Sequence, residues 1–225
     1  MYAMPGMRPD IAYVVVIFSQ HCTNLNKHHW TAVKQIFRYL AGTKELGIHY
    51  GGGARSKEFC DSDWGGSVDR RSTSGYVFTL NGGSISWASR KQPTVALSST
   101  EAEYIALTQA VKEILWLRTH FSELGAPKHA EEISEISSDN QGAIAPAKNP
   151  GFHTQWKHID IQYYFIRKHT DTDTATITLE YCPTDDMTTY VLTKGLSRAP
   201  HEKHTAAMGL LEIRRGHVHS EGECR

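Results

Sequence analysis

The apolar positions near the start of the chain recur with the period of a helix, about 3.6 residues. Residues 11–20 are apolar almost all round and follow Pro9, a residue suited to the first turn of a helix. A second helix is predicted to end at Gly42 and to begin after Asn24 or Asn26, either of which can cap it. Its apolar face consists of Trp30, Val33, Ile36, Phe37 and Leu40.

The pattern changes after a short predicted strand at 46–50 and three glycines at 51–53. Alternating or β-branched runs then predict five further strands, at 57–63, 76–80, 85–88, 133–138 and 176–181. The turn Asn81–Gly83 joins two of them into a hairpin. Helical patterns fall at 100–124, 140–148, 157–168 and 186–194.

This order of elements, three strands followed by alternating helices and strands, indicates an α/β domain with a mixed sheet. The first three strands are expected to be antiparallel. From Ser197 onward the chain is polar and rich in histidine, and we expect it to be loosely ordered.

Composition and charge narrow the class of protein. A hydrophobic content of 40% with 21% charged residues excludes a disordered chain or a fibre. No apolar run reaches the ~20 residues that a membrane span requires, so no contact with a membrane is expected. Four cysteines lie far apart without a C-x-x-C pair, which predicts reduced thiols and an intracellular, reducing compartment, either cytoplasmic or nuclear.

The formal net charge of zero conceals an asymmetry. The first 57 residues hold seven lysines and arginines against two acidic residues. This asymmetry is typical of a polyanion-binding part beside a carboxylate-lined site, although uneven surface charge explains it as well. Lys27, Lys34 and Arg38 form one stripe of the second predicted helix and are the candidate contacts to nucleic-acid phosphates.

Several acidic residues are candidates for chemistry. Glu103 falls on the apolar face of the long predicted helix, where a carboxylate needs a partner or a metal, while Glu101 falls on the opposite, polar face. A capping box from Thr100 to Glu103 is the alternative. Asp139 ends a predicted strand, where α/β sheets place ligand groups, but it also suits a helix cap.

Asp61 and Asp63 lie near the end of the first predicted strand of the α/β domain and can be turn residues. Taken as a set, however, carboxylates from a strand, a helix start and a neighbouring strand end can converge on one point. Such a cluster repels itself unless Mg²⁺ or Mn²⁺ neutralises it. A pair of such ions would activate a water and stabilise the leaving oxygen of a phosphodiester.

A further signal comes from long ungapped stretches, among them FCDSDWGG (59–66), RRSTSGYVF (70–78), ISWASRKQPTVALSSTEAEYIAL (85–107), SDNQGAIA (138–145), KHIDIQYYFIR (157–167) and LTKGL (192–196). They resemble the ribonuclease H region of copia-type retrotransposon polyproteins. The earlier stretches RPDIAY (8–13) and HWTAVKQIFRYLAGTKELGIHY (29–50) resemble the end of the reverse transcriptase and its connection.

The resemblance implies a ribonuclease H-like fold, a mixed five-stranded sheet flanked by helices, and hydrolysis of the RNA strand of an RNA–DNA hybrid. It divides the chain into a helical reverse-transcriptase connection remnant (1–54), a ribonuclease H-like domain (55–196) and a polar tail (197–225). The upstream reverse-transcriptase portion of the polyprotein is then a second partner, beside the hybrid.

The resemblance also assigns roles to residues. Asp61, preferred to Asp63, together with Glu103 and Asp139 would be the catalytic carboxylates that hold Mg²⁺ or Mn²⁺. Lys157 and His158 at the start of a helix would approach the phosphates of the hybrid.

The chain departs from the family pattern at the fourth acidic position, which is Tyr190. A phenol with a pKa of ~10 is not an anionic ligand at neutral pH. Asp186, one turn earlier on the predicted helix, is the residue that would compensate, and Pro146 interrupts another predicted helix. Three hypotheses follow: an impaired ribonuclease H, a catalytically dead module that binds nucleic acid, and a non-functional transposon relic.

Overall fold

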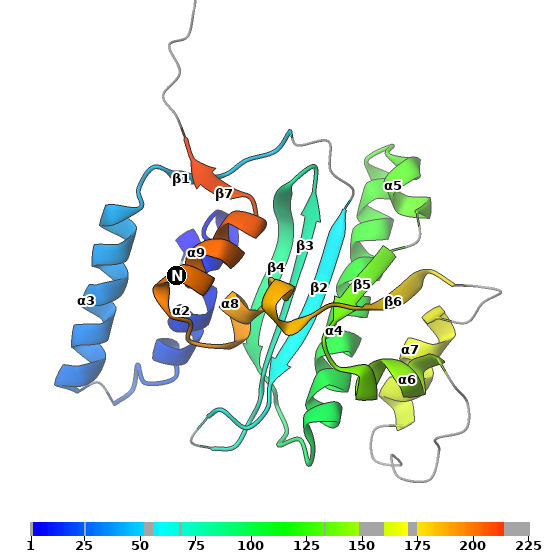
Figure 1. The fold of residues 1–225 in the computed structure, drawn as a ribbon, viewed down its shortest axis with the longest axis horizontal. Coiled ribbons are helices and arrows are strands. Elements are labelled where there is room, and N and C mark those ends of the chain that lie inside the picture. The colour runs from blue at the N-terminus through cyan, green and yellow to red at the C-terminus, as the bar shows by residue number, and fades with distance from the viewer. Residues whose placement is uncertain are drawn as a thin grey trace, which may run out of the picture.

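A five-stranded mixed sheet forms the centre of the molecule (Figure 1). The computed structural model describes residues 2–24, 26–51, 56–67, 69–132, 134–148, 160–170 and 175–213. The strands are β2 (Lys57–Asp63), β3 (Thr73–Leu80), β4 (Gly83–Lys91), β5 (Ser134–Ser138) and β6 (Ile177–Tyr181), in the order β4-β3-β2-β5-β6. The first three are antiparallel, and β5 and β6 run parallel to β2, which confirms the predicted mixed sheet.

The hairpin between β3 and β4 is also confirmed. Asn81 and Gly82 both have a positive φ, of 51° and 86°, as a tight turn between twisted antiparallel strands requires. Alternate residues of β3 face opposite layers. Tyr76 and Phe78 join one hydrophobic cluster and Val77 joins another, so the sheet is buried on both faces.

The helices form the two layers that cover these faces. On one side lie α4 (Ser99–Glu123), α5 (Pro127–Glu131), α6 (Gln141–Lys148) and α7 (Asp160–Thr170). On the other side lie α1 (Ala3–Gly6), the 3₁₀ turn η1 (Pro9–Ile11), α2 (Ala12–Ser19), α8 (Tyr190–Thr193) and α9 (Arg198–Ala207). Helix α6 continues through Pro146, so the proline does not end it. No helix among the described residues is long and apolar enough to cross a membrane.

The last described part of the chain is ordered, contrary to the prediction of a loose tail from Ser197. Helix α9 is followed by β7 (Leu210–Glu212), which pairs antiparallel with β1 (Leu46–Ile48). Met208 and Leu210 are buried in the hydrophobic cluster beside Val77, and these few apolar side chains hold an otherwise polar segment in place. The three-part division of the chain stays a prediction, but its first and last segments pair with one another.

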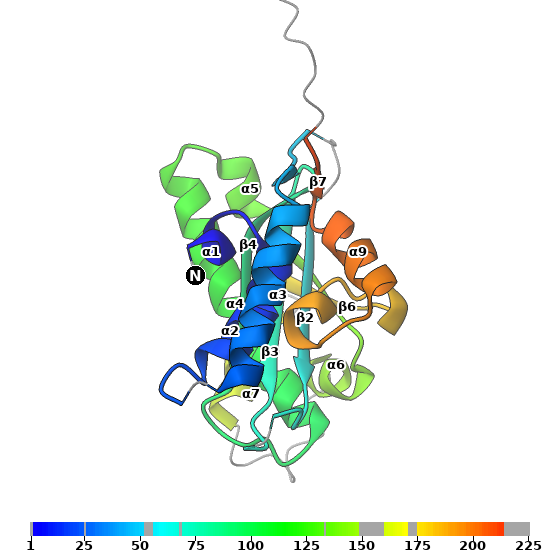
Figure 2. The ribbon, with the colours of Figure 1, turned by 90° about the vertical axis from the view of Figure 1, so that its left-hand side faces the viewer.

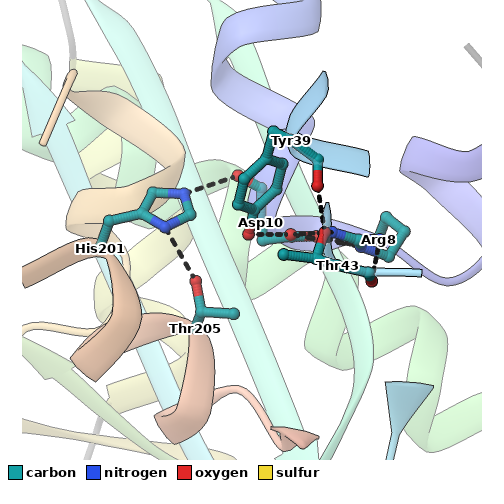
Figure 3. A network of polar contacts seen from close by, with 6 residues as sticks. All are labelled: Arg8, Asp10, Tyr39, Thr43, His201 and Thr205. Atoms are coloured by element: carbon teal, nitrogen blue, oxygen red, sulfur yellow. Dashed lines mark hydrogen bonds and ion pairs between the residues drawn. The ribbon is translucent and has the colours of Figure 1, made fainter. Parts of the chain in front are cut away.

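A buried polar network fixes the start of the chain to two distant helices (Figure 3). Arg8 and Asp10 form an ion pair at 2.7 Å, and the Tyr39 hydroxyl donates to the same Asp10 carboxylate at 2.6 Å. Arg8 also donates to the backbone oxygen and hydroxyl of Thr43, while a ring nitrogen of His201 contacts the backbone oxygen of Asp10. Because a buried charge without its partner is costly, this network stabilises one arrangement of the N-terminal segment against α9.

Helix α3 (Lys27–Gly42) lies at the left edge of the molecule in Figure 1 and in front of the rest of the molecule in Figure 2. Asn26 caps it, because its side chain accepts from the His29 N–H and the His29 ring accepts from the Asn26 N–H. None of its residues is buried, and Trp30 and Phe37 are more than half exposed. The apolar face predicted from the sequence is therefore only partly covered by the rest of the described chain, because Val33, Ile36 and Leu40 are half-buried.

Glu58 provides a first testable prediction, on stability. Burial raises the pKa of its carboxyl from 4.5 to about 7, and one of its two oxygens has no hydrogen-bond partner. A carboxyl whose pKa is raised on folding favours the folded state only while protonated, so it makes stability fall as pH rises from about 4.5 to 7. Glu58→Gln should remove this part of the slope, worth about 3 kcal/mol at most between pH 5 and 8.

Urea unfolding of both proteins at pH 5 and pH 8 measures this slope. The change of the unfolding free energy with pH is the quantity to compare, because the buried amide of the variant alters that free energy by an amount that does not depend on pH. Parallel profiles for the wild type and Glu58→Gln would contradict the prediction.

Candidate metal centre

Three carboxylates converge at the point where two parallel strands diverge. The pairing of β2 with β5 runs to Phe59 and Ser137, two residues before Asp61 and Asp139 respectively. Glu103 reaches the same point from the first turns of α4, which packs on β2. One oxygen from each of these three carboxylates lies within 4.8 Å of the others. The structure therefore brings together the three residues selected from the sequence.

The alternative interpretation of Glu103 as part of a capping box is wrong. The N-cap of α4 is Ser98, whose hydroxyl accepts from the Glu101 N–H at 3.1 Å, and the Glu101 carboxylate accepts from the Leu97 N–H at 2.7 Å. Glu101 is buried by this role and does not lie on an exposed polar face. Glu103 instead accepts a hydrogen bond from the backbone N–H of Ser62 on β2, at 3.2 Å.

Helix α8 holds the opposite side of the cluster. Thr193 donates its hydroxyl to Oδ2 of Asp61. This contact depends on Gly75, the residue paired with Asp61 across β3, because a Cβ there would lie 2.7 Å from the Thr193 methyl group. The absence of a side chain at Gly75 lets α8 approach the sheet closely enough to touch the carboxylate.

Tyr190, the residue that the resemblance assigns to the fourth acidic position, acts as a hydrogen-bond donor at the cluster. Its hydroxyl donates to Oδ2 of Asp139 at 2.6 Å, and the Thr184 hydroxyl lies 3.4 Å from the same oxygen. Burial and then this hydrogen bond raise the pKa of Tyr190, so the phenol stays neutral at physiological pH. Tyr190 therefore contacts the cluster without adding a negative charge to it.

Asp186, the residue expected to compensate for Tyr190, lies away from the cluster. The predicted helix 186–194 is divided into a 3₁₀ turn, η3 (Thr184–Asp186), and the short α8, so the two positions share no helix face. The Asp186 carboxylate is exposed and pairs with Lys203 at 2.9 Å. Asp63 also lies outside the cluster, beside Gly66, as the preference for Asp61 requires.

The electrostatics of the cluster favour a bound cation. Burial raises the pKa of Asp61 to about 6, against the opposing effects of Lys194 and Thr193. Burial raises the pKa of Glu103 well above its ordinary value, and the charges of Asp61 and Asp139 raise it further. The second Glu103 oxygen is buried and has no hydrogen-bond partner among the described residues. These hard oxygens fit Mg²⁺ or Mn²⁺.

An open, polar cleft gives access to the cluster. Its volume is about 320 Å³, and its lining comprises Asp61, Ser62, Glu103, Asp139, Asn140, Gln141, Tyr181 and Lys194. Thr193 and Lys194 are not among the candidate residues indicated by the sequence, although both belong to the stretch LTKGL. The Lys194 ammonium lies 3.8 Å from Asp61 Oδ2 and 3.7 Å above the centre of the Tyr190 ring.

The predicted nucleic-acid contacts are not part of this cleft. Lys27, Lys34 and Arg38 are exposed on α3, which lies at the far edge of the molecule from α6 and α7. Lys34 contacts the face of the Trp30 ring. Lys157 and His158 lie outside the described residues.

Comparisons with known proteins identify the family. No family model matches the chain. It is 45% identical over 179 residues to the retrovirus-related Pol polyprotein from transposon TNT 1-94 of Nicotiana tabacum, a match covering 79% of this chain and 13% of the relative. It is 35% identical over 209 residues to the corresponding polyprotein from transposon RE2 of Arabidopsis thaliana, covering 92% and 14%. The chain belongs to the copia-type retrotransposon Pol polyproteins and spans 13–14% of the length of these two.

A shorter relative and two solved structures are also similar. Secreted RxLR effector protein 161 of Plasmopara viticola is 49% identical over 120 residues, covering 52% of this chain and 84% of the effector. An RNase H1 isolated from compost covers 58% of this chain and 86% of its own, with a TM-score of 0.43 and 13% identity. The N-terminal RNase H domain of a Mycobacterium tuberculosis protein covers 68% and 96%, with a TM-score of 0.40 and 13% identity. TM-scores this low do not establish a common fold. The fold is therefore assigned from the order and direction of the strands.

The second prediction concerns the charge of the cluster without metal. Folding raises the pKa of Asp61 to about 6. Above this pH the ionised Asp61 carboxylate therefore costs free energy in the folded state compared with the unfolded chain. In EDTA at pH 8, Asp61→Asn should therefore stabilise the protein by about 1–3 kcal/mol. The same variant should lose the rise in Tm that Mn²⁺ gives the wild type.

Thermal unfolding with EDTA and with Mn²⁺ measures both effects. Asp186→Asn is the matched control, because its carboxylate is exposed and outside the cluster. A destabilised Asp61→Asn protein that still responds to Mn²⁺ would contradict the prediction.

Proposed function

We propose that this chain is the ribonuclease H part of a copia-type polyprotein and hydrolyses the RNA strand of RNA–DNA hybrids, with its activity impaired by Tyr190. The observation that carries the proposal is the convergence of Asp61, Glu103 and Asp139 at the divergence of β2 and β5. Buried carboxylates at such a point are costly unless a cation neutralises them. The family membership of the chain supports the same conclusion.

The three carboxylates would hold Mg²⁺ or Mn²⁺, which would supply an activated water and stabilise the leaving oxygen of the phosphodiester. The protein's own residues keep the cluster in position. Ser62 fixes Glu103 through its backbone N–H, and Thr193 fixes Asp61 through its hydroxyl. Gly75 allows that second contact. The open cleft admits a substrate phosphate to this point.

Tyr190 is the reason to expect impaired catalysis. It stands where the family pattern has a fourth carboxylate, and its hydroxyl engages Asp139 from that side. A ligand that is neutral and donates a hydrogen bond cannot replace an anionic one on a metal. The second candidate function, a module that binds the hybrid without cutting it, is favoured by this one observation.

The third prediction is the cleavage experiment that tests the function. The wild type should cleave the RNA of a labelled RNA–DNA hybrid weakly, and better with Mn²⁺ than with Mg²⁺, because Mg²⁺ demands a nearly ideal octahedral site. Tyr190→Asp should raise the rate by about tenfold or more, since each 1.36 kcal/mol of transition-state stabilisation is tenfold. Asp61→Asn should abolish cleavage.

Tyr190→Phe is the matched control, because it removes the hydroxyl without adding a carboxylate and should not reach the rate of Tyr190→Asp. Strong Mg²⁺-dependent cleavage by the wild type would contradict the impairment. No cleavage by a folded Tyr190→Asp protein with either ion would favour the binding module instead.

The fourth prediction concerns the partners of α3. We propose that its basic stripe contacts the phosphates of the hybrid and that its partly exposed apolar face contacts the upstream reverse-transcriptase portion of the polyprotein. Each phosphate neutralised by a cation adds about 0.9 to the slope of log K against log salt. Changing Lys27, Lys34 and Arg38 together to Ala should therefore lower that slope by about 2–3.

Hybrid affinity measured between 50 and 200 mM salt tests the stripe. A second triple variant, with Lys128, Arg198 and Lys203 changed to Ala, removes the same charge from other exposed positions and should leave the slope nearly unchanged. Equal slopes for the α3 variant and the wild type would show that the stripe is a solvated surface.

A further inference from the structure

Three large apolar side chains are exposed near the carboxylate cluster. Trp64 is 53% exposed, Val95 48% and Leu97 76%. The ring N–H of Trp64 donates at 3.1 Å to the backbone oxygen of Ala96, the residue between the other two, so the turn after β2 and the loop before α4 lie side by side. We call the side chains of Trp64, Val95 and Leu97 the apolar ledge.

Both segments of the apolar ledge lead directly to the cluster. Trp64 follows Asp61 by three residues, which span about 10 Å in an extended chain. The Leu97 N–H donates at 2.7 Å to the carboxylate of Glu101, two residues before Glu103 at the same end of α4. A long substrate bound at the carboxylates would therefore reach the ledge as well.

Hydrogen bonds and close packing fix the ledge before a ligand binds. Gly65 has a φ of 64°, and its N–H donates to the Ser72 hydroxyl at 3.3 Å. A Cβ on Gly66 would collide with the Asp63 carboxylate, so the tight turn after Trp64 requires this glycine. A surface that is already ordered loses little entropy on binding, which favours a role in recognition.

Positive charge borders the ledge. The loop that holds Gly65 contains two exposed arginines, Arg70 and Arg71. Arg70 has a φ of 62°, which is uncommon outside glycine, and it forms no ion pair with the residues that the structure describes. The acidic residue of this loop, Asp69, is paired with Lys91 at 2.8 Å. An aromatic surface bordered by cations is typical of nucleic-acid binding.

The chemistry of the ledge distinguishes the two strands of a hybrid. The wide, shallow minor groove of an A-form duplex displays the sugars of its strands. A ribose presents a 2′-hydroxyl there, and burying a hydroxyl against apolar side chains without a hydrogen-bond partner costs free energy. A deoxyribose presents a methylene group at the same position. The ledge therefore fits the sugars of a DNA strand better than those of an RNA strand.

We infer that the apolar ledge packs against deoxyriboses of the DNA strand of a bound hybrid, and that Trp64 is a specificity-determining residue that favours a hybrid over an RNA duplex. The inference rests on the proposed function and adds to it a means of recognising the substrate. The ledge contacts the sugars through apolar groups, so its contribution to affinity does not depend on salt, unlike that of the basic stripe on α3.

Fluorescence anisotropy tests the inference, with a labelled RNA–DNA hybrid and an RNA duplex of the same sequence as probes. Asp61→Asn is the common background, because it should not cleave the hybrid. In this background Trp64→Ala should weaken hybrid binding about tenfold, as truncation of a packed aromatic contact does, with little change for the RNA duplex. The slope of log K against log salt should stay the same. Trp64→Phe should keep most of the preference, because it keeps an aromatic ring.

Trp116→Ala is the matched control. Trp116 is 56% exposed, close to the value for Trp64, and stacks on His120. It lies 13 residues after Glu103, about 20 Å along α4, so its replacement should leave both affinities unchanged. Circular dichroism checks that each variant is folded. Leu97→Ser should weaken hybrid binding in the same sense, and it decides the matter if Trp64→Ala does not fold.

A background protein that binds both duplexes equally would overturn the inference and leave the proposed function standing. The same holds for an unchanged preference in the ledge variants, or for an equal loss with both duplexes. A lost preference in Trp64→Ala, combined with a wild type that cleaves no hybrid, would support the inference and contradict the proposed function. No hybrid binding by the background protein would overturn both.

Discussion

The central constraint on this structure is the placement of three carboxylates side by side, two buried and one half-buried, at the divergence of two parallel strands. Asp61 is 1% exposed and Glu103 is 5% exposed, so neither charge is solvated by bulk water. The surrounding elements compensate in part, because a backbone N–H from β2, a hydroxyl from α8 and a phenol beside Asp139 each donate to one carboxylate. The close approach of α8 over Gly75 is part of the same arrangement. The oxygens left without donors make the cluster a place for a cation.

Tyr190 supplies a neutral hydrogen-bond donor beside the cluster. Its hydroxyl satisfies Asp139 by a hydrogen bond, and its ring supports the ammonium of Lys194 on its face. Tyr190 therefore has a structural role beside the carboxylates. A substitution that disrupted packing here would also disturb Val191 and Leu192, which are buried on the same short helix.

Local sequence signals gave the secondary structure where they act over a few residues. The hairpin at Asn81–Gly82, the cap at Asn26 and the whole of β2 depend on turn chemistry and alternation that a local pattern contains. The predictions failed where the pattern was weak. Helix 186–194 is broken at Met187–Thr189, and the polar segment after Ser197 folds because Met208 and Leu210 dock on a core made by distant residues. Glu101 is buried because it caps a helix whose N-cap, Ser98, lies two residues before Thr100, the cap considered from the sequence.

The sequence by itself determined the family of this protein, the mixed sheet and the three carboxylates, because long ungapped motifs and strand and helix periods are properties of neighbouring residues. It also led to the expectation that Tyr190 stands where the family has a fourth acid. Only the tertiary structure decided what Tyr190 contacts. The contacts of Tyr190 with Asp139 and of Thr193 with Asp61 join residues 51 and 132 positions apart, and Lys194 reaches Asp61 from the next position along the chain. No local pattern records such distances, since they are set by how closely α8 packs against the sheet.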